Sequence, residues 1–232
     1  MTLSDYIKNH VMPILFEKFY GIPSCTDPSR ILSMIPYVDY ITMFDGSQFK
    51  VTKNLWCVLE ESRSEYDWSD MRNTDTLLDI GAHVGTITIP AALTRVNKVI
   101  AVEPLFADEL RENIRLNNLT NVTVVPFALG SGGVYDLSFF ESGVKKIQTR
   151  TFRGILAMCG GKVDFLKCDC EGGEWNIEPE DLSGIRRIEM EVHPSMGNKD
   201  NHTLVEYIKA NWNVKIDKRT GGDTYILHAY KR

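Results

Sequence analysis

The sequence predicts an α/β fold in which helices cover a mostly parallel β-sheet that closes with an antiparallel hairpin. From residue 75 onward, short apolar runs alternate with stretches whose apolar residues recur at helical spacing. This alternation is typical of parallel strands joined by crossover helices. The C-terminal stretch 213–232 instead has the pattern of two strands joined at Gly221-Gly222, which predicts the closing hairpin.

The strands of the sheet are predicted from five apolar runs, at residues 76–80, 98–103, 122–129, 164–169 and 185–193. Between the second and third runs, the segment ADELRENIRLNN places Leu110, Ile114 and Leu116 on one side of a helix. The chain from 75 to 232 is therefore expected to form one domain.

Residues 1–74 differ in character and are predicted to form an N-terminal α/β appendage. This part combines a helical stretch with an alternating apolar and polar segment around Asp45-Gly46. A two-residue Asp-Gly turn between alternating segments is a strong signal for a β-hairpin.

Composition restricts the possible functions. The 232 residues are 43% hydrophobic and 25% charged, as in ordinary globular proteins, and the formal net charge is −5. Nucleic acid is not an expected partner, because phosphate binding usually requires a basic surface.

No apolar run approaches the ~20 residues of a membrane span. The first residues include Asp5, Lys8 and Pro13, unlike a secretory signal, and the five cysteines are scattered. We therefore expect a cytoplasmic protein without a disulfide framework.

A glycine loop follows the first predicted strand, in the segment LLDIGAHVGTITI. Ligands of open α/β sheets bind at the carboxyl ends of strands, where this loop lies. A dinucleotide fingerprint requires G-x-G-x-x-G, but after Gly81 the next two glycine positions hold His83 and Thr86. A histidine side chain obstructs the approach of a pyrophosphate, so dinucleotide binding is disfavoured.

The same residues suit a nucleoside that carries no phosphate. Asp79, Gly81 and Gly85 form D-x-G-x-x-x-G, and the second strand ends in Glu103. A carboxylate at that position can accept hydrogen bonds from both ribose hydroxyls. The loop amides can hold a carboxylate, and Asp79 can offset an ammonium group. S-adenosylmethionine has all three groups, and it is the predicted cofactor.

The segment FLKCDCEGGEW, which follows the fourth strand, first suggests a zinc site. However, a structural zinc site needs four ligands, and no second Cys/His pair lies nearby in the sequence. In a strand, Cys168 and Cys170 face one side, and Lys167 and Asp169 face the other. We therefore expect the cysteines to pack as small hydrophobic residues, without a metal. A Mg²⁺ site at Asp169 and Glu171 stays open as an alternative.

Several of these segments together resemble the FkbM family of S-adenosylmethionine-dependent methyltransferases. The resemblance covers residues 75–193 and includes the E-P after the second strand, an asparagine pair, A-L-G at 128–130 and K-x-D-x-E-G-x-E at 167–174. It implies a class I methyltransferase (Rossmann-like) fold with a seven-stranded sheet. It also implies O-methylation of a small-molecule or sugar-like acceptor. The implied cofactor contacts are Asp79, Gly81, Ala82, His83, Gly85, Glu103, Pro104 and Ala128. The cysteines and residues 1–74 depart from the family pattern.

Three residues are candidates for catalysis: Asp169, Glu171 and His193. Methyl transfer depends mainly on alignment of the acceptor with the sulfonium, and a hydroxyl acceptor must also lose a proton. A histidine titrates in a suitable range, whereas the carboxylates could equally orient the acceptor or cap a turn. The sequence does not decide which of the three acts as the base.

Other functions and partners remain open at this point. The EP…NIRLN run also resembles tRNA guanine methyltransferases, although the basic RNA-binding domains of those enzymes are not visible here. A non-catalytic S-adenosylmethionine-binding module is a further alternative, disfavoured because both Asp79 and Glu103 are present. Residues 1–74 could form a lid, an acceptor wall or a dimer contact, and a homo-oligomer is left open.

Overall fold

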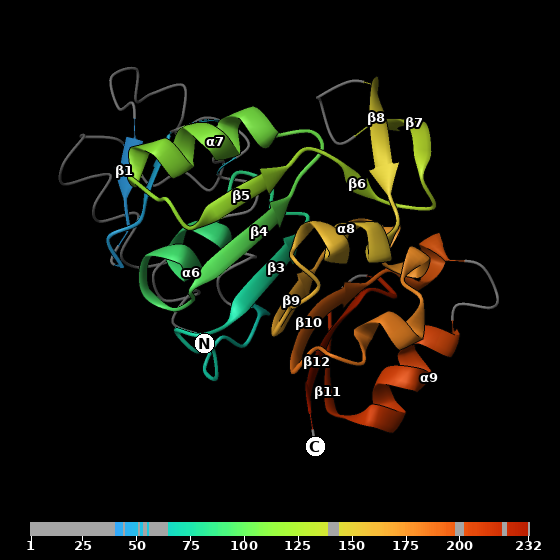
Figure 1. The fold of residues 1–232 in the computed structure, drawn as a ribbon. Coiled ribbons are helices and arrows are strands. Elements are labelled where there is room, and N and C mark those ends of the chain that lie inside the picture. The colour runs from blue at the N-terminus through green and yellow to red at the C-terminus, as the bar shows by residue number, and fades with distance from the viewer. Residues whose placement is uncertain are drawn as a thin grey trace, which may run out of the picture.

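A seven-stranded sheet forms the centre of the protein, with the strand order β11-β12-β10-β9-β3-β4-β5 (Figure 1). This computed structural model describes residues 40–43, 45–50, 52, 55, 65–138, 144–197, 202–219 and 222–231. Strands β5, β4, β3, β9 and β10 pair in parallel, and β12 pairs antiparallel with both β10 and β11. The predicted parallel sheet with a C-terminal antiparallel hairpin is confirmed.

The strands of this sheet lie close to the predicted apolar runs. They are β3 (Thr76–Ile80), β4 (Lys98–Val102), β5 (Val122–Val125), β9 (Phe165–Cys168), β10 (Arg187–Val192), β11 (Trp212–Lys218) and β12 (Tyr225–Lys231). The third run was predicted as one strand over 122–129, and this prediction is wrong. Strand β5 ends at Val125, and Ala128–Leu129 forms β6 in a different sheet. Pro126 lies between them and has no N–H to continue the pairing.

Helices cover both faces of the sheet. The α-helices are α6 (Thr88–Thr94), α7 (Ala107–Leu116), α8 (Phe152–Met158) and α9 (His202–Asn211). Three short 3₁₀ helices are η3 (Gly173–Asn176), η4 (Pro179–Leu182) and η5 (Pro194–Met196). Helices α6 and α7 pack on one face, and α8 and α9 pack on the other.

Alternation along the strands divides the apolar residues into two cores. In β3, Leu78 and Ile80 belong to the core beneath α8 and α9, whereas Leu77 belongs to the core beneath α6 and α7. Successive side chains of a strand point to opposite faces, so a strand buried on both sides is apolar almost throughout. Asp79, on the α6 side of β3, interrupts this pattern and is fully buried.

A second, three-stranded sheet was not predicted. It has the order β6-β8-β7, with β7 over Gly133–Ser138 and β8 over Val144–Arg150. Strand β8 pairs parallel with β6 and antiparallel with β7. Figure 1 shows this small sheet beyond the carboxyl end of β5. It therefore adds a wall to the edge where ligands of α/β sheets bind.

The described part of the N-terminal segment contains the predicted hairpin. Strands β1 (Tyr40–Thr42) and β2 (Gln48–Lys50) pair antiparallel on either side of Asp45-Gly46. The helical stretch predicted before this hairpin lies outside the described residues. Among the residues that can be described, no helix combines the length and the apolar character needed to cross a membrane.

Two asparagines of α7 attach this hairpin to the rest of the fold. Asn113 Oδ1 accepts a hydrogen bond from the Lys50 amide at 2.8 Å, and Asn117 Oδ1 accepts one from the Gln48 amide at 2.8 Å. Asn117 also donates to the Gln48 carbonyl at 2.6 Å. The asparagine pair that carries the family resemblance thus satisfies backbone groups of β2.

Candidate functional site

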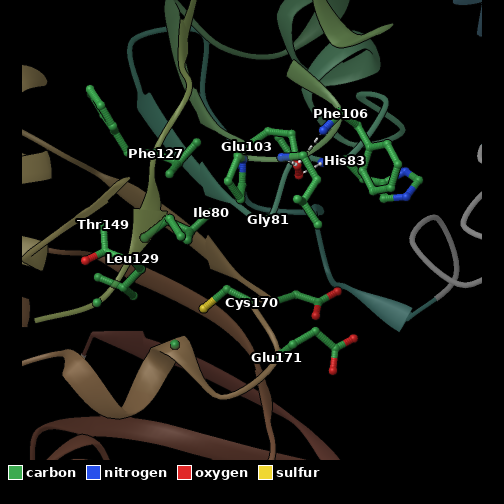
Figure 2. Close-up of a pocket in the computed structure, with 18 of the residues that line it drawn as sticks. Ile80, Gly81, His83, Glu103, Phe106, Phe127, Leu129, Thr149, Cys170 and Glu171 are labelled. Carbon is green, nitrogen blue, oxygen red and sulfur yellow. Dashed lines mark hydrogen bonds between the residues drawn. The ribbon is translucent and has the colours of Figure 1, made fainter. Parts of the chain in front are cut away.

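A cavity of about 730 Å³ opens at the carboxyl ends of the parallel strands. Its wall is built from the loops after β3, β4 and β9, from Glu191 of β10, from Arg219 after β11 and from the small β6-β8-β7 sheet. Figure 2 shows Glu103, His83 and Phe106 on one side, and Phe127, Leu129 and Thr149 on another. Its volume is typical of cavities that bury a drug-sized ligand.

The glycine loop passes very close to the end of β9. Gly81 has a φ of +77°, and a Cβ atom there would lie 1.7 Å from the carbonyl oxygen of Asp169. The Gly81 amide donates to the Val102 carbonyl at 2.9 Å, which holds the loop against β4. Glycine is required at this position both for the positive φ and for the close backbone approach.

Gly85 has a packing role. Its φ is +97°, and a Cβ atom would lie 2.7 Å from Leu110 Cδ1 on α7. Gly85 lies outside the cavity wall, and its contact with the cofactor stays a prediction. Ala82, between the two glycines, does line the cavity.

Glu103 lines the cavity and organises two loops at once. Its Oε2 atom accepts from the His83 amide at 2.8 Å, and its Oε1 atom accepts from the Leu105 and Phe106 amides at 2.6 and 2.9 Å. Burial raises the pKa of Glu103, although the three amide hydrogen bonds oppose this shift. The neighbouring Pro104 also lines the cavity. The role predicted for Glu103, holding the ribose of the cofactor, stays a prediction.

His83 contributes its ring to the cavity wall. The residue has a φ of +50°, and its ring centroid lies 4.2 Å from that of Phe106. Burial, together with the positive charge of Lys167, lowers the pKa of His83 to about 4. The imidazole is therefore neutral at physiological pH and forms part of a largely apolar surface. Ala128 lines the cavity from the small sheet.

Asp79 is not among the residues that line the cavity, and its contact with the cofactor stays a prediction. Its carboxylate is fully buried and accepts a hydrogen bond from Thr88 Oγ1 at 2.6 Å. The Lys167 ammonium lies 3.5 Å from Asp79 Oδ1. Any effect of Asp79 on a ligand is therefore transmitted through Lys167, which does line the cavity.

Lys167 connects the glycine loop with the acidic segment after β9. Its Nζ atom donates to the Gly81 carbonyl at 2.7 Å and lies 3.8 Å from Asp169 Oδ2. Burial disfavours the charged ammonium, but Asp79 and Asp169 outweigh this effect and raise the pKa of Lys167. The lysine is therefore a buried, fully charged group shared by both acids.

Two of the three predicted catalytic residues line the cavity. Asp169 Oδ2 accepts a hydrogen bond from the Tyr66 hydroxyl at 3.0 Å. Glu171 has a φ of +53°, and its side chain is 51% exposed (Figure 2). Partial burial raises the pKa of Glu171, and nearby His193 opposes this shift. Both carboxylates can reach a ligand in the cavity.

His193, the third candidate, is buried outside the cavity wall. Its Nδ1 atom lies 3.0 Å from Glu174 Oε1, and its Nε2 atom lies 3.3 Å from Glu171 Oε2. Burial disfavours the imidazolium, but the hydrogen bond to Glu174 and the surrounding carboxylates raise the pKa of His193 to about 9. His193 therefore contacts the carboxylates of the wall from behind, and its catalytic role stays a prediction.

The sequence analysis missed Glu191, which is buried and lines the cavity. Arg219 Nη1 lies 3.1 Å from Glu191 Oε1, and His193 Nε2 lies 3.7 Å from the same atom. Burial raises the pKa of Glu191 to about 8, and neighbouring Asp169 adds to this shift. Glu191 lies two residues before His193 on the same face of the strand, so period-two alternation could have identified it.

Cys168, at the end of β9, and Cys170, two residues later, pack as expected. Cys168 is fully buried in the core beneath α8 and α9, and Cys170 packs against that core. Their Sγ atoms lie 3.5 Å apart. Both behave as small apolar residues.

Comparison with known proteins points to methyltransferases. The family profile described as "Methyltransferase FkbM domain" matches residues 79–214. A probable ribosomal RNA small subunit methyltransferase A from Methanosphaera stadtmanae is 39% identical over 59 residues, which are 25% of this chain and 21% of that protein. The 23S rRNA (uracil(1939)-C(5))-methyltransferase RlmD of Klebsiella pneumoniae is 40% identical over 63 residues, 26% of this chain and 14% of that protein.

Both of these matches are partial: the matched segments span about a fifth or less of the length of these curated relatives. Among solved structures, a precorrin-6y C5,15-methyltransferase from Geobacter metallireducens aligns with a TM-score of 0.45 and 16% identity. That alignment covers 70% of this chain and 82% of the other.

Proposed function

The chain belongs to the FkbM family of S-adenosylmethionine-dependent methyltransferases, and from this premise we propose that it methylates a hydroxyl group of a small-molecule or sugar-like acceptor. The observation that carries the proposal is that one cavity is lined by two groups of residues. Glu103 and the glycine loop form one part, and the carboxylates of Asp169, Glu171 and Glu191 form the other.

The Glu103 part suits S-adenosylmethionine. A buried carboxylate at the end of β4 can accept hydrogen bonds from ribose hydroxyls in addition to the three amides that it already binds. Phe106 and the neutral ring of His83 offer an apolar surface beside it. When bound, the cofactor supplies an electrophilic methyl group on a sulfonium.

The acidic part suits a hydroxylated acceptor. Carboxylates accept hydrogen bonds and carry no proton to donate when ionised, so they orient hydroxyl groups. In the proposed reaction the acceptor oxygen forms a bond to the methyl carbon as the carbon–sulfur bond breaks. The hydroxyl proton passes to a carboxylate, for which Asp169 is our candidate because it lines the cavity where the glycine loop meets β9.

RNA is the alternative acceptor class, suggested by the names of the two curated relatives. The acidic wall argues against it, because the carboxylates of Asp169 and Glu171 would repel the phosphate groups next to a target base. The Glu171 side chain is 51% exposed, so its charge is open to an approaching ligand. A small uncharged or hydroxylated acceptor avoids this repulsion.

Calorimetric titration with S-adenosylhomocysteine, compared with NAD, tests the assignment of S-adenosylmethionine as the methyl donor, called the donor assignment below. We expect micromolar affinity for the former, about −8 kcal/mol, and none for NAD.

Glu103→Gln should weaken this binding about tenfold or more, and the exposed control Glu112→Gln should not. Asp169→Asn should keep the cofactor affinity and lose turnover. Absence of S-adenosylhomocysteine binding to the wild-type protein would favour a non-catalytic role.

A further inference from the structure

Three side chains from the ends of β9 and β10 converge beside the acidic part of the cavity: Asp169, Glu191 and His193. One potential ligand atom of each lies within 4.8 Å of the others. Glu191 and His193 are each about 5% exposed, so two of the three are withdrawn from solvent. We propose that these residues form a binding site for a divalent cation. This inference rests on the proposed function only for its consequence in catalysis.

The spacing of the three side chains is close to that of a metal site. Ligand atoms on opposite sides of an octahedral ion of the size of Mg²⁺ lie about 4 Å apart. The observed maximum of 4.8 Å therefore requires only a small inward movement of the side chains. Two carboxylates and one imidazole form a mixed oxygen and nitrogen set, which suits ions such as Mn²⁺ better than a purely thiolate-binding metal.

His193 is oriented as a metal-ligating histidine usually is. Glu174 is fully buried, and its Oε1 atom accepts from the backbone amide of His193 at 2.9 Å and lies 3.0 Å from His193 Nδ1. Gly172 N donates to the other oxygen of Glu174 at 2.9 Å. Nδ1 therefore donates to Glu174, and Nε2 is directed to the carboxylates of Glu171 and Glu191. A carboxylate that holds the distal ring nitrogen is a common partner of histidine ligands.

The other contacts of the two carboxylates leave room for a cation. Lys167 and Arg219 are cations beside the cluster, and each is shared: Lys167 with Asp79, and Arg219 with Glu65. Their contacts occupy one oxygen of each ligand carboxylate, Oδ2 of Asp169 and Oε1 of Glu191. A bound divalent ion would take the place of the protons on Glu191 and on Nε2 of His193, because metal ligands bind in their deprotonated forms.

The location gives the ion a chemical role. Asp169 and Glu191 both line the cavity, so an acceptor hydroxyl can complete the coordination of the ion. A hydroxyl bound to a divalent cation loses its proton more readily, which would assist its attack on the methyl group. The magnesium site considered from the sequence, on Asp169 and Glu171, therefore changes in its ligands, because the convergent set replaces Glu171 with Glu191 and His193.

Titration with MnCl₂ of the full chain, first treated with a chelator, tests this site. The loss of the free Mn²⁺ signal in electron paramagnetic resonance is followed with and without S-adenosylhomocysteine. We expect saturable binding of one ion per chain. Glu191→Gln and His193→Gln should each weaken it at least tenfold, and the exposed control Asp108→Asn should leave it unchanged. Glu174→Gln should weaken it about tenfold through loss of the histidine orientation.

Each result can be separated from the donor assignment, because S-adenosylhomocysteine affinity is measured on the same samples. Retained cofactor binding in Glu191→Gln shows that the variant is folded. If the wild-type protein binds the cofactor but no Mn²⁺ under either condition, the metal site is wrong and the donor assignment stands. Equal Mn²⁺ affinity in Glu191→Gln, His193→Gln and the wild-type protein would also overturn it.

Discussion

The Lys167 ammonium lies 2.7 Å from the Gly81 carbonyl oxygen, so a buried side chain of β9 holds the glycine loop that follows β3. The same ammonium lies 3.5 Å from Asp79 and 3.8 Å from Asp169. The Lys167 cation therefore links the glycine loop, which we assign to the methyl donor, with Asp169, which we assign to the methyl acceptor.

Lys167→Met should destabilise the protein by about 3–5 kcal/mol, because it leaves buried Asp79 without its ion-pair partner. The control is Lys162→Met, whose ion pair with Asp164 is largely exposed and should contribute no more than about 1 kcal/mol. Urea unfolding measures both. Equal losses in the two variants would show that Lys167 has no special role in stability.

Gly81→Ala and Gly160→Ala separate backbone strain from steric clash. Both glycines have a positive φ, +77° and +83°, so each substitution introduces comparable strain of about 1 kcal/mol. Only Gly81 would place a Cβ atom 1.7 Å from the Asp169 carbonyl oxygen, whereas nothing lies within 4 Å at Gly160. We expect Gly81→Ala to lose at least about 2 kcal/mol more in urea unfolding. A similar loss in both variants would mean that the loop and β9 can separate without cost.

Asn113→Ala should loosen the attachment of the β1-β2 hairpin. Asn113 accepts from the Lys50 amide and donates to the Val84 carbonyl, both at 2.8 Å, and it is buried. Loss of the side chain leaves these backbone groups unsatisfied, at a cost of about 1–3 kcal/mol. Hydrogen exchange at the Lys50 amide should become faster. Asn211→Ala, on the exposed end of α9, is the control and should leave that amide unchanged.

His228 predicts a specific dependence of stability on pH. Its Nδ1 atom lies 2.6 Å from Glu189 Oε2, and this hydrogen bond raises the pKa of His228, assisted by Asp217 and opposed by burial and Lys215. A raised folded-state pKa contributes stability that is complete below the unfolded value of about 6.5 and is lost as the pH rises through the folded value.

The measurement is urea unfolding of the wild-type protein and His228→Gln at about pH 6 and about pH 9. The difference in free energy of unfolding between the two proteins should be larger at the lower pH. Other groups that titrate in this range, including His193 and Glu191, are present in both proteins and do not affect the difference. A difference that stays constant with pH would contradict the stabilising role of the protonated imidazole.

Much of the fold could be predicted from the sequence because the strands are short apolar runs bounded by turn residues. Strand β3 has the predicted bounds, and the Asp45-Gly46 turn has its hairpin. The prediction of one strand over 122–129 was wrong because the apolar run continues past Pro126, whereas the parallel pairing of β5 ends before it. The β7-β8 hairpin has polar, exposed strands, so its sequence lacks the apolar signal used to find the others.

The candidate site could be predicted only in part. Glu103 and Asp169 line the cavity because the ends of neighbouring parallel strands meet at one edge. Asp79 lies at the same edge, but the long side chain of Lys167 reaches between it and the cavity, and sequence spacing does not show such a tertiary contact. Glu191 could not be predicted from residues that follow a strand, because it lies within β10 and its side chain enters the cavity from there.

The β6-β8-β7 sheet has a consequence for how this scaffold can vary. A single continuous stretch, residues 128–150, leaves the main fold after β5, supplies Leu129, Tyr135 and Thr149 to the cavity, and returns at α8. Its strands pair with one another and not with the seven-stranded sheet. Changes within this one stretch should therefore reshape the cavity wall, while the hydrogen bonding of the large sheet stays intact.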